Sequence, residues 1–309
     1  MINLSDIRIK EIKNKEELLE RLMVVGKTSA VNKKIAMYVE KNYNAIVFMT
    51  ADKISQEIGV SQGSISRFCV KMQYRGYNDF LRYLQKIISS EMTTSKRFSM
   101  LDKEDDNDKN LNILNQEVNN LQELQELAQT PEYAKAVNLI AKSKKVFLIS
   151  NRMSATILPY MNYILSRLRP DVFELRYGSP EWENIDLTSP EEVVVFTTVF
   201  PRYSRTLLEK NKRLKNKGFK IVALTDSRLS PIVPYAAVSL ITPITVSSVF
   251  DVYSTPLLLI NLLMRDVSKK IPNIDKRLDE IERSNKANNS FFNVAGIESS
   301  ADEALIDKS

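Results

Sequence analysis

The 309-residue chain contains no histidine, one cysteine and seven glycines. Without histidine it has no imidazole for acid–base catalysis, and it lacks the commonest zinc ligand. The single cysteine, Cys69, excludes a disulfide within the chain and is typical of a reducing cytoplasm. The composition therefore disfavours most enzyme mechanisms, and we expect no catalytic residues, no cofactor and no metal.

Long hydrophobic runs are missing as well. The longest candidate, residues 256–264, is too short to span a bilayer. The first residues, MINLSDIRIKEIKNKEE, are charged and lack the apolar stretch of a signal peptide. We expect a cytoplasmic protein without membrane contact, and the length of the chain suits two domains.

The excess of positive over negative side chains lies in the N-terminal third. Residues 1–100 contain 17 Lys and Arg against 10 Asp and Glu, whereas the other 209 residues contain 27 against 28. A basic N-terminal module on a nearly neutral body is typical of a nucleic-acid reader with a separate second domain. An ordinary solvated basic surface is the alternative interpretation.

Residues 50–72 show the spacing of a helix-turn-helix. Thr50 is placed to cap a first helix, Gly59 to end it in a left-handed conformation, and Ser61 to cap a second helix. Apolar residues recur at helical spacing around the glycine, at Ile54, Ile58, Val60, Ile65, Phe68 and Met72. The pattern predicts a DNA-binding helix-turn-helix, with an ordinary pair of packed helices as the alternative.

The second of these helices begins with poor helix formers, in the stretch GVSQGSISRF. A recognition helix must approach DNA closely, so short donors at Ser61, Gln62, Ser64 and Ser66 can reach phosphates or base edges. We interpret the small and polar front end as an adaptation to DNA.

This stretch resembles the N-terminal domain of the RpiR/MurR family of bacterial transcription regulators. The family shares a GVS-x(4)-[SV]-RF-x(2)-K core and an aromatic-x-G-aromatic step, present here as Gly59-Val60-Ser61, Ser66-Arg67-Phe68, Lys71 and Tyr74-Arg75-Gly76-Tyr77. The resemblance spans most of residues 20–90. It implies that Gln62, Ser64, Ser66 and Arg67 lie in the DNA groove and that Ser61, Lys71 and Arg75 contact phosphate. Phe68, Tyr77 and Phe80 are expected to pack the core.

The second half of the chain alternates short apolar runs with helical segments. Five runs are rich in β-branched residues, at 144–150, 171–175, 191–198, 219–226 and 236–242. The alternation predicts a parallel five-stranded sheet covered by helices on both faces, which is a three-layer α/β domain. Ligands bind such sheets beyond the carboxyl ends of the strands, so the loops at 150–155, 197–206 and 225–230 form the candidate site.

In order and spacing these units resemble the sugar isomerase (SIS) domain, the usual partner of this helix-turn-helix. The resemblance rests on ALTDSRLSPIVPYAAVSLI and SSVFDVYSTPLLLINLL, and it implies that loops after the first and third strands bind a phosphosugar through amides and hydroxyls. The chain departs from the family in these loops. The usual G-x-G-x-S is Ser150-Asn151-Arg152-Met153-Ser154, and the usual S-x-S-G-x-[TS] is Val199-Phe200-Pro201-Arg202-Tyr203-Ser204.

Three interpretations of the altered loops stay open. Arg152 and Arg202 can replace the missing amides and bind an anion, with hydroxyls from Ser154, Ser204 and Thr225 around it. The pocket can instead have changed its ligand class, with Arg202 and Tyr203 binding something other than a phosphosugar. In the third interpretation the loops are structural and both arginines pair with acidic neighbours.

The chain divides into two domains and two polar segments. We predict a helix-turn-helix domain over residues 1–90, a solvated linker over 91–115, a SIS-like effector-sensing domain over 116–270 and a polar tail over 271–309. The segment NILNQEVNNLQELQELAQ forms a polar helix with Leu114, Val118, Leu121, Leu124 and Leu127 on one side. That side either covers the second domain or forms a dimer contact.

We predict an effector-sensing transcription regulator that is not an enzyme. Its expected partners are double-stranded operator DNA and a small anionic metabolite such as a phosphosugar or sugar acid. We expect a homodimer or homotetramer, because one helix-turn-helix reads only a short half-site. A phosphosugar isomerase with an extra domain is the alternative enzyme, and a ligand-free SIS scaffold is the alternative interaction protein.

Overall fold

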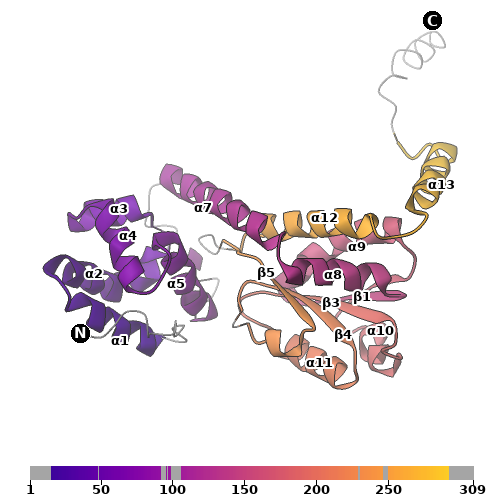
Figure 1. Cartoon of the computed structure of the whole chain (residues 1–309), viewed down its shortest axis with the longest axis horizontal. Helices are drawn as coiled ribbons and strands as arrows, with labels where there is room; N and C mark the ends of the chain where they lie inside the picture. The colour runs from indigo at the N-terminus through magenta and orange to yellow at the C-terminus, as the bar shows by residue number, and fades with distance from the viewer. Residues whose placement is uncertain are drawn as a thin grey trace, which may run out of the picture.

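The computed structural model describes residues 15–47, 49–91, 95, 97–98, 106–228, 230–245 and 250–291. A helical N-terminal domain and a C-terminal α/β domain are joined by the long helix α7 (Figure 1). The predicted fold class, a helix-turn-helix domain followed by a three-layer α/β domain with a parallel sheet, is confirmed. No helix within the described ranges is both long enough and apolar enough to cross a membrane.

The N-terminal domain packs its helices around a single apolar core. Its helices are α1 (Lys15–Gly26), α2 (Ala30–Ile46), α3 (Ala51–Ile58), α4 (Gln62–Lys71) and α5 (Tyr77–Glu91). Leu22, Ile35, Ile54, Phe68 and Phe80, one from each helix, are at most 2% exposed. The apolar positions predicted from helical spacing therefore form this core.

The turn between α3 and α4 has the predicted local chemistry. The Thr50 hydroxyl accepts a hydrogen bond from the Lys53 amide at 3.1 Å, and the Ser61 hydroxyl accepts one from the Ser64 amide at 3.2 Å. Between them Gly59 ends α3 with a φ of +60°. A side chain is disfavoured in that left-handed conformation, so the turn depends on glycine.

The C-terminal domain contains one parallel sheet in the order β2-β1-β3-β4-β5. Its strands are β1 (Lys145–Ile149), β2 (Val172–Leu175), β3 (Val193–Val199), β4 (Lys220–Thr225) and β5 (Val238–Ile241). Each falls on one of the predicted runs, and only β3 extends beyond its run, by one residue. The central strand β3 is buried along its whole length, which is why it consists of a continuous run of apolar and β-branched residues.

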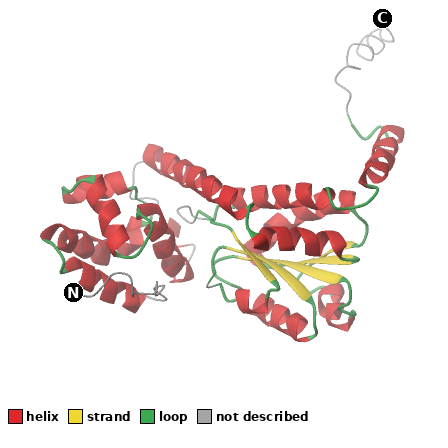
Figure 2. Cartoon of the chain, viewed as in Figure 1, coloured by secondary structure: helices red, strands yellow, loops and turns green. Residues whose placement is uncertain are grey.

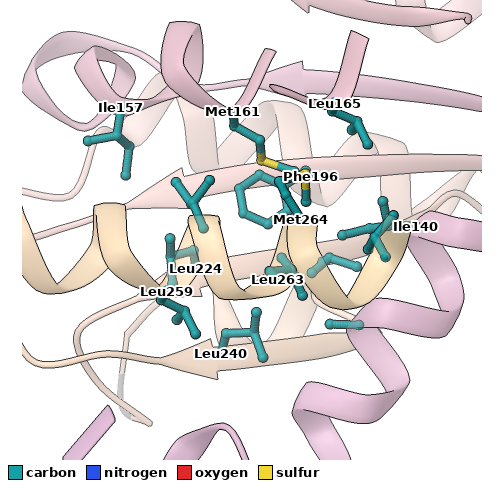
Figure 3. Close-up of a cluster of buried hydrophobic side chains, with 14 of the residues drawn as sticks. Ile140, Ile157, Met161, Leu165, Phe196, Leu224, Leu240, Leu259, Leu263 and Met264 are labelled. Carbon is teal, nitrogen blue, oxygen red and sulfur yellow. The ribbon is translucent and has the colours of Figure 1, made fainter. Parts of the chain in front are cut away.

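Helices cover both faces of this sheet (Figure 2). One face packs against α8 (Pro131–Lys142), α9 (Leu158–Leu168) and α12 (Ser254–Ser268), and the other against α10 (Pro180–Asn184) and α11 (Arg205–Asn216). On the first face Phe196 and Leu224 from the strands meet Met161, Leu263 and Met264 from the helices (Figure 3). Short 3-10 helices occupy three of the connections: η1 (Arg152–Ile157), η2 (Ile185–Leu187) and η3 (Val233–Tyr235).

The polar segments are more helical than the sequence indicated. Helix α7 spans Asp106–Leu127, so it begins inside the range predicted as a solvated linker. The linker residues 92–94, 96 and 99–105 lie outside the described residues. In the predicted tail, α13 (Ile274–Ala287) is anchored by Arg277, whose guanidinium donates to the carbonyls of Ser166 and Arg167. Residues 292–309 lie outside the described residues.

Two glycines of the helix-turn-helix allow a matched test of this turn. A Cβ at Gly59 would be in ordinary contact with the Lys34 amine at 3.8 Å, but the φ there is positive. Gly63 is helical, and the nearest atom to a Cβ there is the tip of the flexible Arg67 side chain, at 3.3 Å. We expect Gly59→Ala to lower the free energy of unfolding by about 1–2 kcal/mol. Gly63→Ala should raise it by up to about 1 kcal/mol. Urea denaturation of the full chain measures both changes in the free energy of unfolding. Equal effects of the same sign would contradict the left-handed conformation of Gly59.

Candidate DNA interface and effector cavity

Helix α4 presents one buried face and one solvent face. Ile65, Phe68 and Cys69 are buried, and burial raises the pKa of the Cys69 thiol to about 12. The solvent face carries Gln62, Gly63, Ser66, Arg67, Val70 and Lys71. Four of the residues predicted to contact DNA therefore share the exposed side of one helix, and Arg75 is exposed in the following turn.

Two predicted DNA contacts also hold the front of α4 together. The Ser61 hydroxyl caps the helix and lies 2.9 Å from the Ser64 hydroxyl, which accepts a hydrogen bond from the Arg67 guanidinium at 3.1 Å. This arrangement orients Arg67 along the solvent face. The contacts of all seven residues with DNA remain predictions.

The aromatic residues near α4 pack the core, as expected. Phe68, Tyr77 and Phe80 are at most 8% exposed. The Tyr77 hydroxyl donates to the Met49 carbonyl at 2.7 Å, which ties α5 to the chain before α3. These rings are not available for stacking on bases.

A cavity of about 650 Å³ separates α4 from α7. Gln62, Gly63 and Ser66 line one side of it, and Asn115 and Asn119 of α7 line the other. Arg67 and Lys71 do not line this cavity. The solvent face of α4 is thus divided, with Gln62 and Ser66 toward α7 and Arg67 and Lys71 away from it.

In the second domain a cavity of about 380 Å³ opens at the carboxyl ends of β1 and β2. Two guanidinium groups, those of Arg152 and Arg176, line it, together with Asn151, Glu174 and Ser204. Ser204 is also the N-cap of α11, so the positive end of that helix dipole lies beside the cavity. The arrangement favours a negatively charged ligand.

The structure brings only some of the predicted effector residues to this cavity. Arg152 and Ser204 line it, whereas Arg202, Tyr203, Ser154 and Thr225 do not. The Tyr203 hydroxyl donates to the Asp226 carboxylate at 3.0 Å, and the Ser154 hydroxyl accepts from the Phe200 amide at 3.2 Å. The Thr225 hydroxyl bonds to the Val199 carbonyl and to Ser230. These three side chains therefore form hydrogen bonds within and between the loops.

Arg152 and Arg202 adopt backbone conformations that usually belong to glycine. Their φ angles are +54° and +61°. These are the positions at which the SIS-type loops have glycine, so each loop keeps the left-handed turn while carrying a large cation. A non-glycine residue in this region costs about 1–2 kcal/mol, and such strain is found mostly at functional sites.

The two charged residues that β2 and its loop contribute to the cavity, Glu174 and Arg176, were not predicted. Glu174 lies in β2 and Arg176 directly follows that strand, whose loop was left out of the candidate site. The signal for Arg176 was available, because parallel strands end at the same edge of a sheet and the run DVFEL is followed at once by arginine. Burial raises the pKa of Glu174, and Arg176 opposes that shift.

Asn151, which lines the cavity, carries a buried polar atom without a hydrogen-bond partner among the described residues. Its amide nitrogen donates to the Ser204 hydroxyl at 2.7 Å, while its amide oxygen is buried and has no hydrogen-bond partner within the described chain. A buried acceptor without a donor is unfavourable. A ligand with a hydroxyl or amine group would supply that donor.

Comparisons with known proteins agree with this architecture. Residues 18–91 match the model for the helix-turn-helix domain of the rpiR family, and residues 139–265 match the SIS domain model. The chain therefore joins an rpiR-type helix-turn-helix domain to a SIS domain. An uncharacterized HTH-type transcriptional regulator of Clostridium perfringens is 22% identical over 207 residues, which are 67% of this chain and 74% of the relative.

Two solved structures are similar to parts of this chain. The sugar isomerase domain of an RpiR transcription factor from Sphaerobacter thermophilus is 19% identical, with a TM-score of 0.52, and the match covers 56% of this chain and 97% of that one. The NanR protein of Vibrio vulnificus, solved in complex with ManNAc-6P, is 17% identical with a TM-score of 0.49. That match covers 87% of this chain and 98% of NanR.

The left-handed arginines give a direct test of the loop geometry. Arg152→Gly and Arg202→Gly should each raise the free energy of unfolding by about 1 kcal/mol, because glycine removes the left-handed strain. Lys212→Gly is the control, since Lys212 is exposed and lies inside α11. That change should lower the free energy by about 1 kcal/mol. Denaturation curves in which all three variants lose stability equally would show that the arginine side chains, and not the turns, dominate.

Proposed function

We propose that the protein is a transcription regulator in which α4 reads operator DNA and the cavity beyond β1 and β2 binds an anionic metabolite. The observation that carries the proposal is the joining of an rpiR-type helix-turn-helix, with an exposed polar and basic α4 face, to a SIS domain whose cavity holds two guanidinium groups. In this proposal neither domain acts as an enzyme.

The cavity supports a ligand with both a negative group and hydroxyl groups. Arg152 and Arg176 can each form two parallel hydrogen bonds with a phosphate or carboxylate. The free oxygen of Asn151 and the carboxylate of Glu174 are acceptors for ligand hydroxyls. A phosphosugar or a sugar acid combines these groups, so we infer that the effector belongs to this class.

One observation favours a second function. A carboxylic acid whose pKa is raised by burial, as that of Glu174 is, suits a general base. A phosphosugar isomerase would use such a base to move a proton between adjacent carbons. Incubating the protein with sugar phosphates and following them by NMR distinguishes the two functions. We expect binding without turnover, and turnover abolished by Glu174→Gln would favour the isomerase instead.

The DNA-binding part is tested at Arg67. It is exposed on α4 and held beside Ser64, so Arg67→Ala should lose about 1–3 kcal/mol of operator affinity while the domain stays folded. The operator is selected from random duplexes with the wild-type protein, and affinity is measured by gel shift at fixed salt. Arg228→Ala, at an exposed arginine of the second domain, is the control. Wild-type affinity in a folded Arg67→Ala variant would contradict this role.

The effector part is tested at three arginines. Sugar phosphates and sugar acids are screened by thermal shift, and the best binder is titrated by calorimetry. Arg152→Gln and Arg176→Gln should each lose about 1.5–3 kcal/mol of binding free energy, because each removes a charge-assisted contact. Arg202→Gln should bind as the wild type does, since Arg202 does not line the cavity. Loss at Arg202 with none at Arg176 would move the site to the loop after β3.

A further inference from the structure

The predicted DNA-reading side of α4 shares its cavity with two arginines. Gln62 and Ser66 line the cavity of about 650 Å³ between α4 and α7, and so do Arg75 in the turn before α5 and Arg82 within α5. Guanidinium groups beside base-reading side chains form a surface that suits the phosphate backbone of DNA. Arg82 therefore joins the residues that can contact phosphate, although the sequence did not single it out.

Helix α7 brings anions to these two arginines. Its Glu123 carboxylate forms an ion pair with Arg82, and its Glu126 carboxylate lies 4.0 Å from the Arg75 guanidinium. Within α5, Asp79 accepts a hydrogen bond from Arg82 at 3.2 Å. The two arginines and Asp79 carry a net charge of +1, and the two glutamates change the net charge of the cluster to −1. The cluster therefore attracts phosphate only when α7 is away.

The space between α4 and α7 excludes a DNA duplex. A recognition helix enters a major groove about 12 Å wide, whereas a cavity of about 650 Å³ has the size of a small-molecule pocket. Asn115 and Asn119 of α7 form the wall opposite Gln62 and Ser66. A duplex in contact with these two residues of α4 would therefore occupy the place of α7.

The other side of α7 is fixed to the SIS domain. Leu124 is 2% exposed, Asn120 donates to the Thr245 hydroxyl at 2.9 Å, and a carboxylate of α7 accepts from Ser254 at the start of α12. In Figure 1 the C-terminal end of α7 lies against this domain, and the helix extends from there toward the N-terminal domain. The position of α7 over α4 thus depends on contacts with both domains.

We propose that α7 is an autoinhibitory segment, whose carboxylates compete with DNA phosphate for Arg75 and Arg82 and whose amide side chains cover Gln62 and Ser66. The inference rests on the proposed function, because it requires α4 to be the DNA-reading helix. DNA binding then requires α7 to leave α4. The measured affinity is reduced by the fraction of molecules in which α7 is in place.

The decisive experiment measures the DNA affinity of the full chain after the two carboxylates are neutralised. Glu123→Gln with Glu126→Gln should lower the operator dissociation constant about fivefold, because both arginines become available to phosphate. The matched control is Glu280→Gln with Glu282→Gln, at two exposed glutamates of α13. It changes the net charge of the chain by the same amount and should bind as the wild type does. Gel shifts at one fixed salt concentration measure all three proteins.

A cross-link across the cavity provides a second measurement. Asn78 of α5 and Asn115 of α7 both line the cavity and are exposed. Because Cys69 is buried, Asn78→Cys with Asn115→Cys introduces the two reactive thiols, which a short reducible cross-linker joins within one chain. The cross-linked chain should not shift the operator, and reduction of the linker should restore the shift.

Three results would overturn the proposal: an unchanged dissociation constant in the folded glutamate variant, an equal gain in the control, or operator binding by the cross-linked chain. The gel shift with Arg67→Ala separates this failure from failure of the proposed function. If Arg67→Ala weakens binding while the glutamate variant does not strengthen it, α4 reads DNA and only the autoinhibition is wrong. If neither the wild type nor the glutamate variant binds any duplex, both inferences fail.

Discussion

A small set of buried hydrogen bonds at the carboxyl end of β3 holds together the loops on the cavity side of the C-terminal domain. The Ser150 hydroxyl donates to the Thr198 carbonyl and the Thr198 hydroxyl to the Ser154 carbonyl, both at 2.7 Å, and the Phe200 amide donates to the Ser154 hydroxyl. These atoms are shielded from water, so losing one partner leaves a buried polar group unsatisfied at a cost of about 1–3 kcal/mol. The loops after β1 and β3 are therefore held to each other before any ligand arrives. The Ser154 hydroxyl, which the sequence predicted to bind the effector, accepts a hydrogen bond from the backbone of the neighbouring loop.

Local patterns in the sequence predicted what local chemistry controls. The caps at Thr50 and Ser61, the left-handed Gly59 and the five strands all depend on neighbouring residues, and all were predicted. Contacts between distant residues were not predicted. The buried ion pair of Arg97 with Asp251, at 2.6 Å, joins positions that are 154 residues apart. No local pattern in the sequence predicts such a pair. The start of α7 was missed because its first residues, DNDKN, are typical of a solvated linker, whereas packing of the later turns on both domains stabilises the whole helix.

The candidate site was predicted only in part, because it also depends on contacts between residues that are distant in the sequence. The strand ends located the edge of the sheet, and that edge contains the cavity. Which side chains line the cavity depends on how each loop turns. Arginine disfavours a positive φ, so residue preference alone would not place Arg152 and Arg202 in left-handed turns. Their alignment with glycines in the SIS-type loops was used only to infer missing backbone amides, and the left-handed geometry was not predicted. Arg202 lies outside the cavity, whereas Arg176 lines it.

Packed contacts connect the cavity loop to the helix-turn-helix. Ser154 bonds to Phe200, the Phe200 ring lies 4.8 Å from that of Tyr253, and Ser254 donates to Glu117 of α7. Two turns further along, α7 pairs with Arg82 of α5. Such a chain of contacts couples two sites only if a ligand binds one arrangement more tightly than another. The energies are compatible with coupling, because a partly exposed ion pair contributes at most about 1 kcal/mol and typical coupling free energies are about 1–3 kcal/mol. An effector with an ordinary preference for one arrangement would therefore outweigh the contacts that hold α7 against α5.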